Sequence, residues 1–121
     1  MRTKGYGLII GGNMITKDFN EVVQSQLDYC KQLLITKGQE YSLDEDRLLV
    51  FKRAAELQGE SPKQALCGMM AKHIISIYDM CMSDQTFNDA KWTEKITDAM
   101  NYLLLLKAMV KEANYDEEKK T

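Results

Sequence analysis

Histidine, proline, tryptophan and cysteine are scarce in this sequence of 121 residues. The single histidine, His73, excludes a metal site built from several histidines. The three cysteines, Cys30, Cys67 and Cys81, form no CxxC pair, which argues against a disulfide framework and against a zinc site. We therefore interpret them as small apolar residues of a protein in the reducing cytoplasm.

Basic stripes and long apolar runs are also missing. The net charge is −2, with acidic and basic residues interleaved, so the sequence lacks the positive surface that duplex nucleic acid requires. No apolar run reaches about 18 residues, so no membrane span is expected. The start, MRTKGYGLIIGGN, is too weakly apolar for a signal peptide. We expect a cytoplasmic location, with neither a membrane nor duplex nucleic acid as a partner.

What the sequence does contain is apolar residues at helical spacing. Hydrophobic residues make up 45% of the chain and proline occurs only at Pro62, so the pattern predicts an all-α fold with four main helices in a bundle. The expected helices are 17–37, 43–58, 62–82 and 89–113. They form a single domain, 14–113, between a short N-terminal arm or upstream extension, 1–13, and a charged tail, 114–121.

Several helix boundaries carry sequence signals. The clearest is SPKQ, 61–64, in which serine is the N-cap, proline takes the first helical position and glutamine completes a capping box. Ser42, followed three residues later by Glu45, predicts a second capping box that opens the helix from Leu43. Gly38 lies where a left-handed C-terminal cap would end the first helix.

The apolar patterns of 62–82 and 89–113 predict two long central helices. Apolar residues cover nearly the whole circumference of each, which is typical of helices surrounded by neighbours. One small bundle cannot bury this much apolar surface, and its exposure would compromise solubility. We therefore expect a homo-oligomer with these two helices at or near the interface.

Polar residues on these apolar helices are informative, because burying a polar group without partners is costly. Two stripes recur at spacings of three and four, which place their members on one helix face. They are Lys72, Ser76 and Asp79 on the first helix, and Glu94, Asp98 and Asn101 on the second. If the stripes face each other, the carboxylates can hold Mg²⁺ and the lysine can contact a phosphate. Solvated surface pairs explain the same spacings, so the residues alone leave both interpretations open.

A likeness to a known family is carried by KGQEY, DEDRLLVFKRAAELQG, GMMAKHIISIYDM and WTEKITDAMNYLLLL. In these stretches the chain resembles small phage and prophage proteins of the all-α nucleoside triphosphate pyrophosphatase superfamily, which includes MazG-like and nucleotide-modification-associated domains. The resemblance covers about residues 15–111. It implies an oligomeric helical bundle in which acidic residues on two central helices hold Mg²⁺ and a nucleotide is cleaved between its α- and β-phosphates.

The resemblance also implies roles for particular residues. Glu94 and Asp98 match the second acidic motif and would be metal ligands. The family's first motif, two glutamates three residues apart, is absent, because Lys72 and His73 occupy that region and Asp79 is its only acid. The implied catalytic residues are Asp79, as a further ligand or general base, and Lys72, as a phosphate clamp. The implied substrate-binding residues are His73, Asn101, Tyr102, Arg47 and Arg53.

Three functions stay open on this basis. A phage-type Mg²⁺-dependent nucleoside triphosphate pyrophosphohydrolase would need Glu40, Asp44 or Asp46 from the first connection to complete its metal site. A non-catalytic protein on the same scaffold would bind and sequester a nucleotide, and lysine and histidine in place of glutamates favour direct phosphate contact. A structural or protein-binding helical module would need no small ligand. If a phage encodes the chain, its location is the host cytoplasm.

Overall fold

The computed structural model describes residues 12–43 and 45–120, and these contain four helices and no strand. The helices are α1 (Thr16–Gly38), α2 (Leu49–Gln58), α3 (Pro62–Met82) and α4 (Asp89–Lys120). The predicted all-α fold with four helices is therefore confirmed. Residues 1–11 of the predicted N-terminal arm lie outside the described residues. No described helix combines the length and apolar character that a membrane-spanning segment needs.

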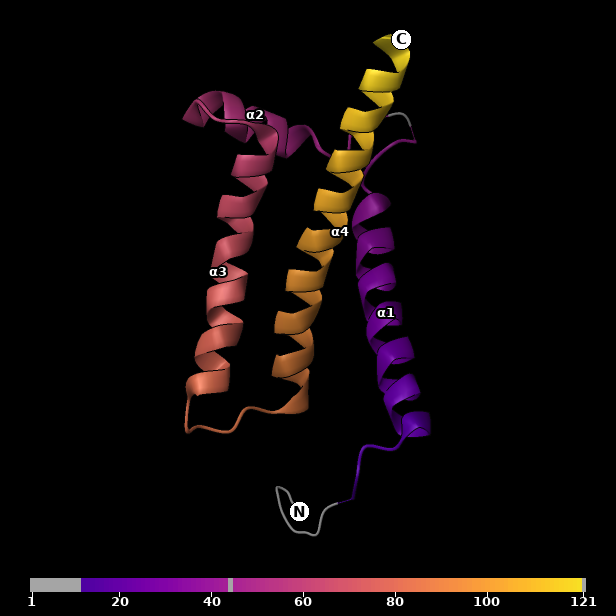
Figure 1. The fold of residues 1–121 in the computed structure, drawn as a ribbon, viewed down its shortest axis with the longest axis vertical. Helices are drawn as coiled ribbons and strands as arrows, with labels where there is room; N and C mark the ends of the chain where they lie inside the picture. Colours follow the sequence, from indigo (N-terminus) through magenta and orange to yellow (C-terminus); the bar gives the residue numbers. More distant parts are fainter. Residues whose placement is uncertain (1–11, 44, 121) are drawn as a thin grey trace.

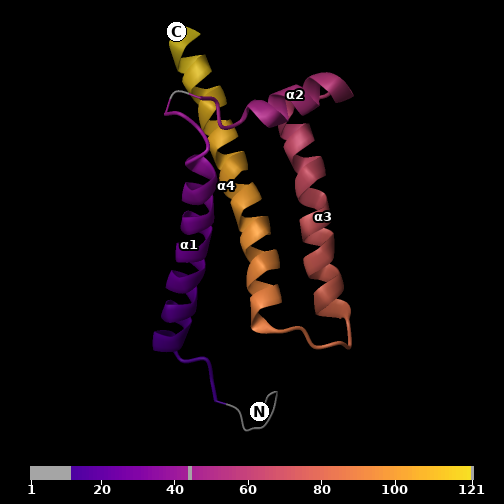
Figure 2. The ribbon, with the colours of Figure 1, turned by 180° about the vertical axis from the view of Figure 1, so that it is seen from behind.

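The three long helices lie side by side in one layer, with α4 between α1 and α3 (Figure 1). Helix α4 contacts both neighbours, whereas α1 and α3 have no Cα atoms within 8 Å of each other among the described residues. Helix α2 crosses the end of α3 and packs against it, and the rear view shows the same arrangement (Figure 2). Within one chain α4 is thus the central helix, and α3 lies at an edge of the layer.

The buried core is small and lies where α2 meets α3 and α4. Leu48, Phe51, Leu66 and Met109 form its cluster, and Leu66 is fully buried. The Phe51 ring meets the Tyr102 ring edge to face, with centroids 6.5 Å apart. Burial of these side chains is what fixes α2 across the layer, because apolar area removed from water is the main favourable contribution to folding.

Helix α1 is held to α4 by fewer contacts. Cys30 is its one buried side chain among the described residues. The amide nitrogen Nε2 of Gln26 donates a hydrogen bond to Thr97 Oγ1 on α4 at 2.8 Å. Phe19, Val22 and other apolar residues of α1 are about half exposed. This helix is therefore the least covered part of the layer.

One predicted helix start is confirmed and the other is wrong. At α3 the capping box forms in full, since Gln64 N–H donates to Ser61 Oγ at 3.2 Å and Ser61 N–H to Gln64 Oε1 at 2.8 Å. At the second helix Ser42 N–H also donates to Glu45 Oε1, at 2.6 Å, yet α2 begins only at Leu49. Side chains in this connection bind backbone N–H groups in turns and so compete with helix formation.

Two predicted helix ends also differ from the structure. Gly38 is the last helical residue of α1 and is followed by right-handed Gln39, so it is not a left-handed cap. The left-handed glycine is Gly59, at φ 66°, which ends α2. Helix α4 continues past the predicted end at Ala113 to Lys120. The tail consists mostly of good helix formers, which explains why the helix extends into it.

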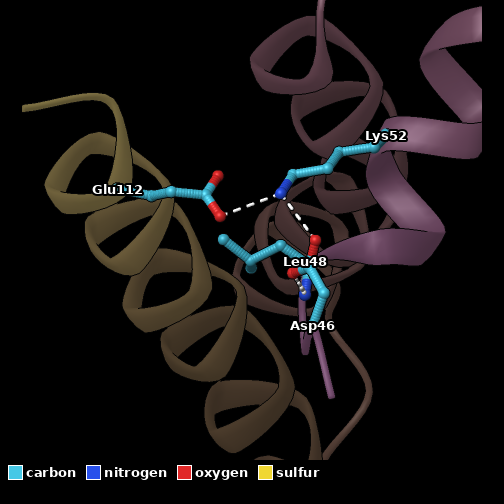
Figure 3. Close-up of polar contacts among 4 residues, drawn as sticks. All are labelled: Asp46, Leu48, Lys52 and Glu112. Carbon is cyan, nitrogen blue, oxygen red and sulfur yellow. Dashed lines mark hydrogen bonds and ion pairs between the residues drawn. The ribbon is translucent and has the colours of Figure 1, made fainter. Parts of the chain in front are cut away.

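Lys52 on α2 links three segments at one end of the fold (Figure 3). Its Nζ lies 2.6 Å from Asp46 Oδ2 in the preceding loop and 2.8 Å from Glu112 Oε2 on α4. The other oxygen of Asp46 accepts a hydrogen bond from Leu48 N–H at 2.9 Å, at the start of α2. The hydrogen bond from Lys52, together with that from Leu48, lowers the pKa of Asp46, and the bonds to Asp46 and Glu112 raise the pKa of Lys52.

We expect the Asp46→Ala variant to lose about 1–2 kcal/mol of unfolding free energy, because it removes the acceptor for Leu48 N–H and one ion pair of Lys52. Asp46→Asn keeps an acceptor and loses only the partly exposed ion pair, so its cost should be at most about 1 kcal/mol. Urea unfolding at neutral pH measures both values. Equal losses for the two variants would contradict a stabilising hydrogen bond from Leu48 N–H to Asp46.

The pH dependence of the unfolding free energy separates the contribution of the Asp46–Lys52 ion pair from that of the hydrogen bond to Leu48. A carboxyl whose pKa is lowered in the folded state stabilises the protein above its ordinary pKa, and this contribution is lost as the pH falls through the lowered value. The advantage of the wild type over Asp46→Asn should therefore shrink in acid. An advantage that stays constant down to about pH 2 would show that the charge of Asp46 contributes nothing.

Candidate functional site

A cavity of about 380 Å³ lies where the end of α1, the loop 39–48 and the start of α2 meet the middle of α4. Its apolar lining consists of Leu33, Leu34, Val50, Phe51, Met69 and Leu105. Its polar and aromatic lining consists of Lys37, Glu40, Tyr41, Arg47, Asp98, Asn101 and Tyr102. We call this cavity the cleft. Its volume falls within the range of small-molecule sites, which are mostly apolar with a few placed polar groups.

Asn101 is the most informative residue of the cleft. Its side chain is only 7% exposed, and its oxygen Oδ1 has no hydrogen-bond partner among the described residues. Nearly all buried polar atoms in proteins are hydrogen-bonded, and leaving one unpaired costs about 1–3 kcal/mol. Thr97, one turn earlier on α4, is equally buried but is satisfied by Gln26. A residue that lines the cleft therefore has a buried acceptor without an N–H or O–H donor among the described residues.

Aromatic rings border the cleft near this acceptor. Tyr102, next to Asn101 on α4, lies between Phe51 and His73. The His73 ring is tilted by 33° against the Tyr102 ring, with centroids 5.0 Å apart. These two contacts orient the tyrosine ring, which is partly exposed and borders the cleft.

Cationic side chains border the cleft where the loop folds over it. The Arg47 guanidinium lies over the Tyr41 ring, with Cζ 4.8 Å from the ring centroid. It also lies close to Gly38, where an added Cβ would be 2.9 Å from Nη1 and the arginine side chain would have to shift. Lys37 adds a second cation at the cleft. Arginine in such a position suits planar recognition of phosphate or carboxylate.

Acidic groups lie at the other side of the cleft. Asp98 lines it, and Asp98 Oδ2 is 3.9 Å from Nδ1 of His73 on α3. This separation is too long for a hydrogen bond, and it is an ion pair only when the histidine is protonated. The structure thus places Asn101 and Tyr102, two predicted substrate-binding residues, in the cleft lining together with Asp98, a predicted metal ligand. His73, a third predicted substrate-binding residue, does not line the cleft but contacts Tyr102 and lies near Asp98.

Glu94 and Asp98, the predicted metal ligands, both line a neighbouring hollow of about 540 Å³ between α1 and α4. Two carboxylates one turn apart fit Mg²⁺ that also binds substrate phosphates, since Mg²⁺ is often held by only one or two protein carboxylates. The described residues contain no group of three acidic, histidine or cysteine side chains that could hold a metal ion. The loop acid Asp46 pairs with Lys52 and does not join them, and Asp44 lies outside the described residues.

The predicted catalytic residues Lys72 and Asp79 lie elsewhere. They line a third hollow together with Lys91 and Lys95 of α4, and neither lines the cleft or the hollow of Glu94. His73 contacts α4, and both residues lie more than a quarter turn away from it around the axis of α3. Arg53, a predicted substrate-binding residue, is exposed on α2 and lines none of the described cavities, whereas Arg47 lines the cleft.

Lys37, Tyr41 and Phe51 line the cleft without having been among the predicted site residues, and Glu40, which was considered only as a further metal ligand, lines it too. Lys37, Glu40 and Tyr41 belong to KGQEY, where spacings of three and four continue the turn of α1 past its end. This spacing could have indicated that the three side chains lie on one side of the chain. The same residues also occur in solvated loops, so the spacing alone did not identify a site. Phe51 gave no such signal, because a buried phenylalanine on an apolar helix face belongs first to the core.

No protein-family model matches the chain, and no curated protein or solved structure gives a significant match. The MazG-like relationship therefore stays a prediction from the sequence.

We expect Asn101→Leu to leave the unliganded protein as stable as the wild type or to stabilise it by up to about 1 kcal/mol, because an unpaired buried acceptor is replaced by an apolar group of similar size. Thr97→Val is the matched control and should cost about 1 kcal/mol, since it removes a satisfied hydrogen bond. Chemical denaturation without ligand measures both. A loss for Asn101→Leu as large as that for Thr97→Val would contradict an unpaired Oδ1.

Proposed function

We propose that this protein binds a nucleotide in the cleft. The observation that carries the proposal is that Asn101, whose Oδ1 is buried and unpaired, lines a cavity that also has aromatic and cationic walls. A nucleotide offers each complementary group: N–H donors on its base, a flat π-surface and a phosphate. Asn101 would accept from the base, Tyr102 would lie against a flat surface, and Arg47 with Lys37 would contact phosphate.

The size and charge of the cleft support a small ligand of this kind. About 380 Å³ lies near the lower end of small-molecule sites and is far from the extended groove that a nucleic-acid strand needs. Both signs of charge occur in the lining, with Arg47 and Lys37 facing Glu40 and Asp98 around it. The likeness of the sequence to MazG-like phage proteins supports the same class of ligand.

A screen of melting temperature against nucleotides, with and without Mg²⁺, tests this function. A ligand at about 100 times its Kd stabilises by about 2.7 kcal/mol, which should raise Tm by roughly 5–10 °C for a chain of this size. Asn101→Leu and Arg47→Ala should lose the shift, while Arg53→Ala, outside the cleft, should keep it. No shift with any nucleoside, mono-, di- or triphosphate would reject the proposal in favour of a structural module.

Nucleotide hydrolysis is the second candidate, and the shared hollow of Glu94 and Asp98 favours it. Because two carboxylates are few for a resident metal, Mg²⁺ would bind there together with the phosphates of the nucleotide. Asp98 lines both this hollow and the cleft, so a nucleotide in the cleft can place its phosphates beside these carboxylates.

If the protein is a pyrophosphohydrolase, Asp98→Asn should abolish Mg²⁺-dependent release of pyrophosphate, with a loss of at least about 100-fold, because it removes the carboxylate that borders both the cleft and the hollow of Glu94. Asp84→Asn, in the exposed α3–α4 loop, is the charge-matched control and should keep full activity. Nucleotide-induced stabilisation without turnover and without need of Mg²⁺ would identify a binding protein instead.

We also propose that the protein functions as a homo-oligomer. Among the described residues nine apolar side chains are buried, whereas 22 large hydrophobic side chains are exposed. A single layer of helices explains this ratio, because it lacks a second layer to cover its broad faces.

A further inference from the structure

A hollow of about 550 Å³ between α3 and α4 is bordered by three lysines, Lys72, Lys91 and Lys95. We call it the lysine hollow. It shares no lining residue with the cleft or with the hollow of Glu94. The whole polar stripe that the sequence predicted on α3 lines the lysine hollow, so this stripe belongs to a cavity of its own.

The three lysines are attached at regular intervals along this hollow. His73 of α3 and Asp98 of α4 lie level with each other, since Nδ1 and Oδ2 are 3.9 Å apart, and the two helices run in opposite directions (Figure 1). Measured from this contact toward the α3–α4 loop, Lys95 lies about 4.5 Å along the axis and Lys91 about 10.5 Å, whereas Lys72 lies about 1.5 Å the other way. Long, flexible side chains about 6 Å apart along the axis suit a ligand with two or more anionic groups.

The charge of the lysine hollow is not neutralised within the chain. None of the three lysines forms an ion pair among the described residues, whereas Lys52 has two carboxylate partners. Asp79 is the one acid among the described residues of the lining, so the net charge of the hollow is positive. Lys95 is half-buried, which weakens the screening of its charge by solvent. A bound anion would relieve the repulsion among these like charges.

The uncharged part of the lining adds hydroxyl donors and an aromatic ring. Ser76 is half-buried, and its hydroxyl has no hydrogen-bond partner among the described residues. Ser83 Oγ accepts a hydrogen bond from Gln85 N–H at 3.0 Å, so its own O–H is available to donate. Lys91 Nζ lies 4.8 Å from the centroid of the Phe87 ring, and this cation–π contact places the ammonium group beside the hollow.

We propose that the lysine hollow binds an oligophosphate, a small anion with two or more phosphate groups, at a site separate from the cleft. Ammonium groups act as point charges toward phosphate oxygens, and hydroxyls donate to the same oxygens. Carboxylates are matched best by the planar fork of arginine, and no arginine is among the described residues of the lining. The volume of the hollow is within the range of small-molecule sites. This inference goes beyond nucleotide binding in the cleft and does not depend on it.

Isothermal titration calorimetry with inorganic pyrophosphate, without Mg²⁺, tests the site. The wild type should bind at about 0.1 M salt and more weakly at about 1 M, because salt screens partly exposed charges. Lys72→Gln and Lys95→Gln should each weaken binding at least about threefold. Lys63→Gln and Lys107→Gln are the matched controls, since they remove the same charge from exposed positions of α3 and α4 outside the hollow. Both controls, and Arg47→Ala in the cleft, should bind like the wild type.

Amine labelling followed by mass spectrometry locates the site on the unmodified chain. Pyrophosphate should slow the acetylation of Lys72, Lys91 and Lys95 and leave that of Lys63 and Lys107 unchanged. Citrate, a tricarboxylate, should bind at least about threefold more weakly than pyrophosphate. Equal affinity for the two anions would overturn phosphate as the ligand class.

Three results would overturn the site itself. The first is no binding at about 1 mM pyrophosphate. The second is binding that is lost in Arg47→Ala and retained in Lys72→Gln and Lys95→Gln, with protection from acetylation at Lys37, because this would place the anion in the cleft. The third is equal weakening by Lys95→Gln and Lys107→Gln, which would reveal attraction to the overall charge of the protein.

Discussion

The position of α4 between α1 and α3 is the constraint on which the rest of the structure depends. The two outer helices do not reach each other, so each is fixed only through α4 and, for α3, through α2. Each described cavity that α1 borders is consequently also bordered by residues of α4. The same arrangement leaves both broad faces of the layer without a covering element among the described residues.

The cleft depends on the loop 39–48 being held in place at one end of this layer. Asp46 joins the loop to α2 through Leu48 and Lys52, and Lys52 joins α2 to Glu112 on α4. Arg47 lies between these bonds and the end of α1, where Gly38 leaves room for it. These partly exposed ion pairs are individually weak, so the loop is positioned by several modest contacts and by the burial of Leu48.

Local signals were the part of the fold that the sequence predicted best. The capping box of Ser61 depends only on residues within one turn, and it forms as predicted. Gly38 was predicted wrongly, because α1 ends with right-handed Gln39 and not with a left-handed glycine. For the site, the periodicity of α4 correctly grouped Asp98 with Asn101. It could not show that Asp79 lies apart from them, because the relative rotation of two helices is set by their packing.

The sequence by itself determined the four helices, their order and the polar residues that each presents, because helix formation and amphipathic spacing are local properties. Only the tertiary structure decided that Asn101 is buried with an unpaired oxygen beside Tyr102 and Arg47. It also decided that α3 lies at an edge, although its composition is that of a central helix. The burial of Asn101 and the edge position of α3 both depend on which helix surfaces contact each other. These contacts result from the packing of all the helices together, so no single stretch of sequence determines them.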